Sequence, residues 1–209
     1  IEAELKGVLE NAKIKAELYD GEKLLAEETV DGAEKNAITF KALQVDEWNA
    51  EIPRLYELYI TLYNADGEVM TIRQYIGFKN IEIKDAVFYF NGKKVKLKGV
   101  NHHDTHETKG YAMSFEDLIK DVELMKEFNV NCVRTSHYPP DPFFLELCDH
   151  YGLYVVDEAD IETHGLWNLD CPEDMISHDL KWAPRYMDRV RRMYFRDRTH
   201  PSIIMWSLG

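Results

Sequence analysis

The chain has 209 residues, of which 25 are lysine or arginine and 38 are aspartate or glutamate, so its formal net charge is −13. With 45% hydrophobic and 12% aromatic residues, the composition is that of a globular protein rather than a disordered tail. The acidity argues against nucleic-acid binding, because phosphates would be repelled. No segment approaches the ~20 apolar residues of a membrane span, so no membrane partner is expected. The three cysteines form no CxxC pair, which favours a reducing cytoplasm over a disulfide framework.

Both ends of the sequence have the character of interior segments. The chain begins without a methionine, and residues 203–209 form an apolar run without a polar tail. We therefore expect an internal fragment of a longer polypeptide.

The first part of the chain, residues 1–82, has the pattern of short antiparallel strands. Residues 12–19 alternate apolar and polar side chains, and residues 55–63 form a longer, aromatic-rich strand that ends at a turn. Residues 69–76 answer it across that turn, and no amphipathic helix is evident. This pattern predicts a small antiparallel sandwich, with Tyr56, Tyr59 and Tyr63 on one strand face in its core.

Residues 83–209 have a different pattern, in which strands alternate with helices. A hairpin with an Asn-Gly turn joins residues 86–90 to 93–100, and Ser114 is the expected N-cap of a helix whose apolar stripe includes Phe128. Further strands are expected at 130–134, 153–157 and 203–207, with helices from Pro142 and at 185–198. Four βα units predict parallel strands. Because a closed barrel needs ~250 residues, they would form the first half of one.

Polar residues follow three of these strands, where barrel enzymes place their chemistry. The segments are 101–107, 134–140 and 157–165, and they hold five of the eight histidines: His102, His103, His106, His137 and His164. Their coincidence with strand ends predicts an active site.

Each group within these segments also has a structural interpretation. Arg134 and His137 suit a hydroxyl-rich or anionic substrate, although the arginine could instead pair with an aspartate inside the barrel. Glu162 and His164 are two residues apart and could hold a divalent ion or form an ordinary Glu–His hydrogen bond. The Asp157-Glu158 pair could serve as general acid and base or could orient the loop.

The same residues make the sequence recognisable. It resembles the large bacterial β-galactosidases of glycoside hydrolase family 2, and the likeness covers nearly the whole chain. The stretches that carry it are KGVNHH at 98–103, RTSHYP at 134–139, YGLYVVDEADIETHG at 151–165 and RTHPSIIMWSLG at 198–209. Residues 48–56 and 75–79 resemble the family's immunoglobulin-like domain, where it leads into the barrel.

The resemblance implies an immunoglobulin-like β-sandwich at 1–82, followed at 83–209 by the N-terminal half of a (β/α)8 TIM barrel with its first four βα units. It also implies a retaining enzyme that hydrolyses terminal β-D-galactose by means of two carboxyl groups. Both catalytic glutamates and a further sugar-binding domain would lie outside these residues. The isolated chain is therefore expected to be inactive.

Residue roles follow from the same resemblance. His103 and His137 are expected to stabilise the transition state, Arg134 and Asn101 to bind the β-galactoside substrate, and Glu162 and His164 to bind Mg²⁺. The sequence departs from the family pattern at three positions: His102, Asp104 and Asp160, where the family often has arginine, glutamate and asparagine.

Two alternatives remain open. One is another specificity of the same family, a glucuronidase or a mannosidase, although the Glu-Thr-His-Gly stretch favours a galactosidase. The other is a non-catalytic carbohydrate-binding module, for which the sandwich is the candidate. Because half a barrel has open sheet edges and an uncovered apolar face, we also expect a homo-oligomer.

Overall fold

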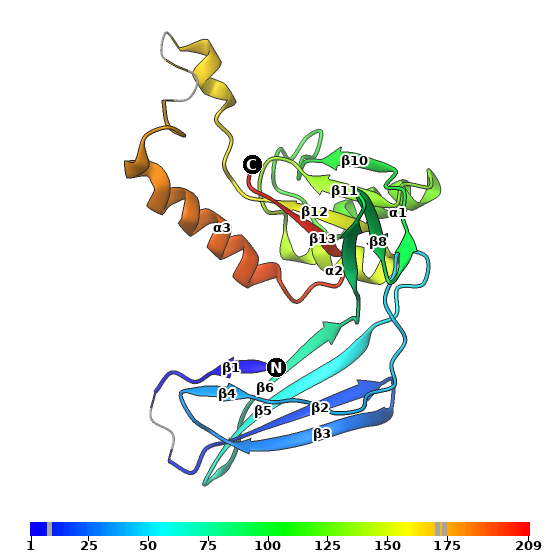
Figure 1. The fold of residues 1–209 in the computed structure, drawn as a ribbon, viewed down its shortest axis with the longest axis vertical. Helices are drawn as coiled ribbons and strands as arrows, with labels where there is room; N and C mark the ends of the chain where they lie inside the picture. The colour runs from blue at the N-terminus through cyan, green and yellow to red at the C-terminus, as the bar shows by residue number, and fades with distance from the viewer. Residues whose placement is uncertain (8–9, 170–171, 173–174) are drawn as a thin grey trace. The chain divides into compact units, whose positions relative to one another are not determined.

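A computed structural model describes residues 1–7, 10–169, 172 and 175–209. The chain forms two compact units (Figure 1). The first contains residues 1–48 and 54–78, and the second contains residues 49–53 and 79–209.

The first unit is an antiparallel β-structure, and the predicted sandwich is confirmed. Four strands pair in the order β3-β2-β5-β6, and β1 pairs with β4 in a separate ribbon. The strands are β1 (Glu2–Glu4), β2 (Lys13–Asp20), β3 (Lys23–Asp31), β4 (Lys35–Ala37), β5 (Tyr56–Asn64) and β6 (Gly67–Ile76).

The core of this unit contains only part of the predicted tyrosine stripe. Tyr56 and Leu58 of β5 are buried together with Leu18 of β2. The placement of Tyr59 and Tyr63 in the same core was wrong. They line a hollow on the opposite face of the sheet, because residues an odd number of positions apart on a strand point to opposite sides.

The second unit begins with an antiparallel hairpin, but the hairpin is shorter than predicted. Its strands are β7 (Ile81–Lys84), β8 (Val87–Phe90) and β9 (Lys93–Lys94). The predicted second arm to residue 100 was wrong, because β9 ends at Lys94 and the chain leaves the hairpin after the Val95 N–H, which donates to the Phe88 carbonyl at 3.3 Å. Asn131 draws the next residues towards another sheet: its side-chain oxygen accepts from the Lys98 N–H at 2.7 Å, and its own N–H donates to the Lys98 carbonyl at 3.0 Å.

That other sheet has four parallel strands in the order β10-β11-β12-β13, so the predicted start of a barrel is confirmed. The strands are β10 (Gly99–His102), β11 (Cys132–Thr135), β12 (Tyr154–Glu158) and β13 (Ile203–Ser207). The helices are α1 (Phe115–Glu127), α2 (Pro142–Tyr151), η1 (His164–Asn168), η2 (Leu180–Trp182) and α3 (Ala183–Asp197).

Local sequence signals set the ends of the first two helices. Ser114 caps α1 in a capping box with Asp117, as predicted, and the Asp141 side chain accepts from the Phe143 N–H at the start of α2. Gly152 ends α2 in the left-handed conformation. The apolar stripe of α1 does not reach Phe128, which is 72% exposed because the helix has already ended there.

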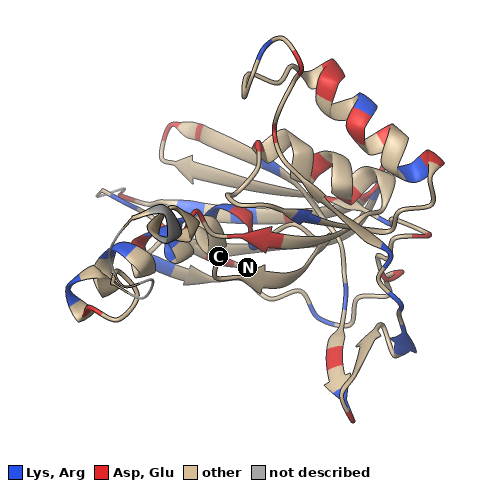
Figure 2. Cartoon of the chain, turned by 90° about the horizontal axis from the view of Figure 1, so that it is seen from above, with Lys and Arg blue, Asp and Glu red and all other residues tan. Residues whose placement is uncertain are grey.

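Helices α1 and α2 pack on one face of the parallel sheet. The core between them contains Leu118 and Val122 of α1, Phe144 of α2, and Val133 and Val155 of the sheet. Within the described ranges, no helix is both long and apolar enough to cross a membrane. Figure 2 shows acidic and basic residues interspersed over helices and strands.

A buried polar group joins α2 to the segment before β13. Asp149 Oδ2 lies 2.6 Å from His200 Nδ1, and Asp149 Oδ1 accepts from the Ser202 N–H at 3.0 Å. Burial alone would lower the pKa of His200, but the hydrogen bond and charge of Asp149 outweigh it and raise that pKa.

Candidate active site

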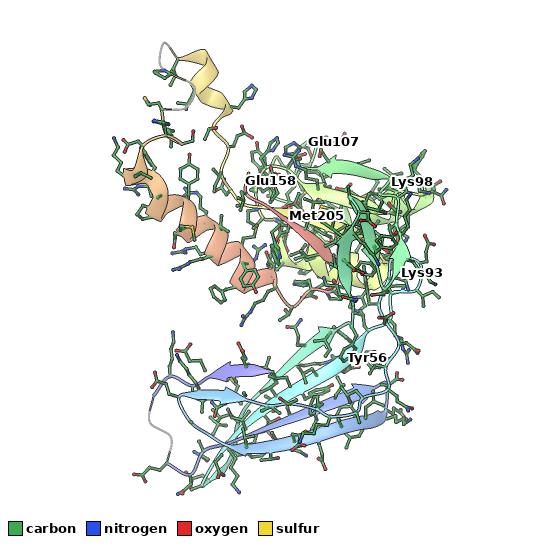
Figure 3. The ribbon with its side chains drawn as sticks, viewed as in Figure 1. Tyr56, Lys93, Lys98, Glu107, Glu158 and Met205 are labelled. Carbon is green, nitrogen blue, oxygen red and sulfur yellow. The ribbon has the colours of Figure 1, made fainter. Side chains whose placement is uncertain are left out.

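The side chains of interest lie at one end of the parallel sheet. Figure 3 shows Glu107 and Glu158 there, whereas Lys98, just before β10, lies at the other end. The strand register pairs Asn101 of β10 with Arg134 of β11, and Glu158 of β12 with Ser207 of β13. Parallel pairing therefore brings polar residues that are far apart in sequence to one end of the sheet. We call this end, which carries Asn101, Arg134, Glu158 and Ser207, the mouth of the sheet.

Glu158 is the centre of this mouth, and its side chain is 1% exposed. Arg134 donates to both of its oxygens, from Nε to Oε2 at 2.7 Å and from Nη2 to Oε1 at 2.9 Å. Ser207 Oγ donates to Oε2 at 2.7 Å, and His137 Nδ1 lies 2.9 Å from Oε1. Two contacts at each oxygen fill the acceptor capacity of the carboxylate.

These contacts decide the charge of Glu158. Burial favours the neutral acid, but the hydrogen bonds from Arg134, Ser207 and His137 outweigh it and hold the pKa of Glu158 below its ordinary value. The carboxylate is therefore ionised and fully engaged, so it is not available as a general acid. It orients Arg134 and His137 instead.

Asp157 lies on the other side of β12, because neighbouring residues of a strand point to opposite faces. Burial and the nearby negative charge of Asp197 raise the pKa of Asp157 to about 7. Its Oδ1 accepts from Thr135 Oγ1 at 3.4 Å. This carboxyl group faces the layer of α3 rather than the mouth, so the pair does not supply two carboxyl groups to one reacting centre.

Four of the predicted site residues are brought together. Arg134 Nη1 lies 3.4 Å from Asn101 Oδ1, and Arg134 Nη2 lies 3.2 Å from His137 Nδ1. The His103 and His137 rings are 5.6 Å apart between centroids. The alternative in which Arg134 pairs with a carboxylate inside the sheet is what the structure has, although the partner is Glu158 and not an aspartate.

The predicted metal ligands lie beside this group. Glu162 Oε2 is 3.5 Å from His137 Nδ1, and Glu162 Oε1 accepts from the His164 N–H at 2.9 Å. Carboxylate oxygen suits Mg²⁺, which requires a nearly octahedral set of ligands. The part of the chain that the structure describes has no group of three acidic, histidine or cysteine side chains arranged to hold a metal ion. Glu162 and His164 therefore do not complete a magnesium site alone.

The other histidines of the predicted cluster have structural roles. His102 lies within β10 rather than after it, its Nε2 is 3.0 Å from Asp121 Oδ2, and its ring stacks on Phe144. His106 Nδ1 accepts from the Thr108 N–H at 3.1 Å inside its own loop.

Sequence reasoning missed Ser207 as a member of the site. It lies at the end of β13, outside the three polar segments that we expected to form the site, and the parallel register of β12 with β13 places it opposite Glu158. A serine among apolar residues at the end of a barrel strand was the available signal.

Together, an antiparallel sandwich and a set of parallel barrel strands with charged side chains at their carboxyl ends define the class: a multidomain protein with a barrel domain. The family model described as "Glycosyl hydrolases family 2, TIM barrel domain" matches residues 81–209, and the model described as "Glycosyl hydrolases family 2" matches residues 2–79. The chain belongs to glycosyl hydrolases family 2.

Curated relatives agree with this assignment. The chain is 42% identical to a beta-galactosidase of Alteromonas mediterranea, covering 94% of this chain and 20% of the relative. It is 40% identical to a beta-galactosidase of Lactobacillus delbrueckii subsp. bulgaricus, covering 100% of this chain and 21% of the relative. The chain thus spans about a fifth of the length of the curated relatives it matches.

Solved structures of the family share the fold. The beta-glucuronidase of Parabacteroides merdae superposes with a TM-score of 0.78 at 23% identity, covering 95% of this chain and 24% of that one. A beta-glucuronidase of Ruminococcus gnavus in complex with uronic isofagomine superposes with a TM-score of 0.81 at 25% identity, covering 94% and 33%.

Proposed function

We propose that the full-length protein is a retaining β-galactosidase that releases terminal non-reducing β-D-galactose. The observation that carries the proposal is the mouth of the parallel sheet, where Glu158 holds Arg134 and His137 beside Asn101 and His103. The identity of about 40% to proteins named beta-galactosidase over nearly the whole chain supports the choice of sugar.

Each residue of the mouth has a proposed role. Because His137 Nδ1 is engaged by Glu158, its Nε2 is left to meet a hydroxyl group of the sugar. His137 and His103 would strengthen their contacts as the sugar becomes oxocarbenium-like, which is the change that lowers the barrier. Arg134 and Asn101 would bind and orient the sugar from the neighbouring strands.

The catalytic carboxyl pair is proposed to come from outside these 209 residues. Retaining hydrolysis needs two carboxyl groups ~5–5.5 Å apart, one of them free to exchange a proton. Glu158 is saturated, and Asp157 faces the layer of α3. In this division of labour, residues 83–209 are the first four βα units of the barrel and supply one wall of the pocket.

Magnesium, compartment and assembly complete the proposal. Glu162 and His164 would supply two ligands of a Mg²⁺ ion whose other ligands lie elsewhere, and such an ion polarises nearby carboxyl groups and water. The free, buried Cys132 and Cys148 support a reducing, cytoplasmic location. The exposed side chain of Val100 lies on β10, an edge strand that the remaining barrel strands would cover in the full-length protein, so the homo-oligomer stays a prediction.

The test compares aryl glycosides of galactose and glucuronic acid as substrates of the full-length protein and of the 209-residue chain. We expect the full-length protein to hydrolyse the galactoside with retention, read from the anomer first released by NMR, and the shorter chain to hydrolyse neither substrate. Turnover by the 209-residue chain would contradict the division of labour, and inversion would contradict the mechanism.

A β-glucuronidase is the second candidate, because solved glucuronidases share the fold over most of the chain. An arginine at the mouth could pair with the carboxylate of a glucuronide. Against this, Glu158 already neutralises the Arg134 charge through two hydrogen bonds, whereas the hydroxyl groups of a neutral sugar can still bind the remaining N–H groups. Preference of the full-length protein for the glucuronide would establish this alternative and exclude the first.

A further inference from the structure

A row of rings leads from the mouth onto the loop that follows β10. The His137 and His103 centroids are 5.6 Å apart, those of His103 and Tyr138 are 6.2 Å apart, and those of Tyr138 and Tyr111 are 6.4 Å apart. Tyr138 is fixed in this row, because its hydroxyl accepts from the Asp104 N–H at 3.1 Å. The proposed sugar site therefore continues into an aromatic surface that ends at Tyr111.

Tyr111 is 77% exposed, yet the loop that carries it is tightly bonded. His106 and Gly110 exchange backbone hydrogen bonds of 2.7 and 3.1 Å. His106 Nδ1 also accepts from the Thr108 N–H at 3.1 Å. The ring is thus presented to solvent by an ordered turn.

The same loop is anchored at its far end. Lys109 Nζ lies 2.6 Å from Asp117 Oδ2, in the first turn of α1. The Ser114 N–H donates to the same carboxylate at 2.9 Å, and Met113 packs against the core that the parallel sheet forms with α1 and α2. Little conformational freedom remains to be lost when a ligand covers Tyr111, which favours binding.

We propose that Tyr111 binds the sugar on the leaving-group side of the cleaved bond, an inference that rests on the proposed galactosidase function. A pyranose ring presents a face of C–H groups that carry small positive charges, and the face of a tyrosine ring is negative, so the two stack. The ring row places this surface beside the residues proposed to hold the galactosyl group. The expected ligand is therefore a disaccharide whose second pyranose lies over Tyr111.

The experiment uses the full-length protein with two substrates, lactose and methyl β-galactoside, which differ in the size of the leaving group. For Tyr111→Ala we expect kcat/KM for lactose to fall by roughly tenfold, mainly through KM, with methyl β-galactoside changed by less than about twofold. Tyr111→Phe keeps the ring and should retain lactose hydrolysis. Phe128→Ala removes a similarly exposed ring, at the C-terminal end of α1, and should change neither substrate.

The results separate this inference from the function on which it rests. An equal loss for both substrates, or a loss of folding seen by circular dichroism, would assign Tyr111 to packing and overturn the inference. Unchanged lactose kinetics would also overturn it. If the wild-type full-length protein hydrolyses neither substrate, the proposed function itself fails, and this inference fails with it.

Discussion

The two units of the chain use charged residues in different ways. In the sandwich, Lys15 pairs with Glu17 at 2.8 Å and Arg73 pairs with Glu57 at 2.8 Å on a sheet face open to solvent. In the barrel unit, the Glu158 side chain is 1% exposed and accepts hydrogen bonds from neighbouring strands. Exposed pairs are screened by water and contribute little, whereas a buried charge depends on every partner it has.

That contrast explains why residue type alone does not locate a site. Both units contain carboxylates that are bonded to arginine and to a hydroxyl group. Tyr59 donates to Glu57 in the sandwich, and Ser207 donates to Glu158 in the barrel unit. Only in the barrel unit are the partners drawn from parallel strands whose ends converge. Burial and topology therefore separate a functional group from a surface pair of the same composition.

The largest effect is expected from Glu158→Gln in the full-length protein. The change removes the charge that holds Arg134 and His137, and a displacement of about 1 Å at such a site costs on the order of 100-fold in kcat/KM. Steady-state kinetics with an aryl β-galactoside would measure it. Glu57→Gln removes the corresponding carboxylate of the sandwich and should leave kcat/KM unchanged. Equal losses of kcat/KM in Glu158→Gln and Glu57→Gln would contradict the difference between the buried and the exposed carboxylate.

A smaller effect, on stability, is expected from Asp149→Asn. The variant breaks a buried pair and should cost about 3 kcal/mol in the free energy of unfolding at pH 6. Because Asp149 raises the pKa of His200, this contribution is fully present below the pKa of an unfolded histidine and is lost as the pH rises through the folded value. Urea denaturation at pH 6 and pH 9 would show a larger cost at pH 6, and a cost that grows with pH would refute the assignment.

The smallest expected effect is a weaker pH dependence of the free energy of unfolding in Asp157→Asn. Burial raises the pKa of Asp157 from 3.8 to about 7, so the protonated form stabilises the fold below pH 4 and that stability is lost as the pH rises towards 7. The variant cannot ionise, so its unfolding free energy should fall less between pH 5 and pH 8 than that of the wild type. The matched control Asp188→Asn removes an exposed pair with Arg192 on α3 and should keep the wild-type slope.

Much of the fold could be predicted from local patterns. The strand at 203–207 matches β13, and Ser114 caps α1 as expected, because an N-cap and an apolar run are properties of adjacent residues. The hairpin arm and the tyrosine stripe were wrong for a different reason. Asn131, far along the chain, determines where β10 begins, and strand parity, not aromatic content, decides which tyrosines are buried.

The sequence predicted which residues lie at the candidate site better than it predicted which hydrogen bonds they form. Arg134, His137 and Asn101 lie close together because parallel strands end at a common edge. The position of Ser207 opposite Glu158 depends on the register of two strands, which no single stretch of sequence encodes. The roles of all six residues, which are Asn101, His103, Arg134, His137, Glu162 and His164, stay predictions.

The fully hydrogen-bonded carboxylate of Glu158 also helps to fix the register of the parallel strands. A slip of one residue in β12 would turn this side chain towards the apolar layer of α1 and α2 and strip it of Arg134, His137 and Ser207. A lone buried charge costs several kcal/mol, so misaligned arrangements are strongly disfavoured during folding. Glu158 therefore has a second role: it favours the strand register in which Arg134, His137 and Ser207 all contact it.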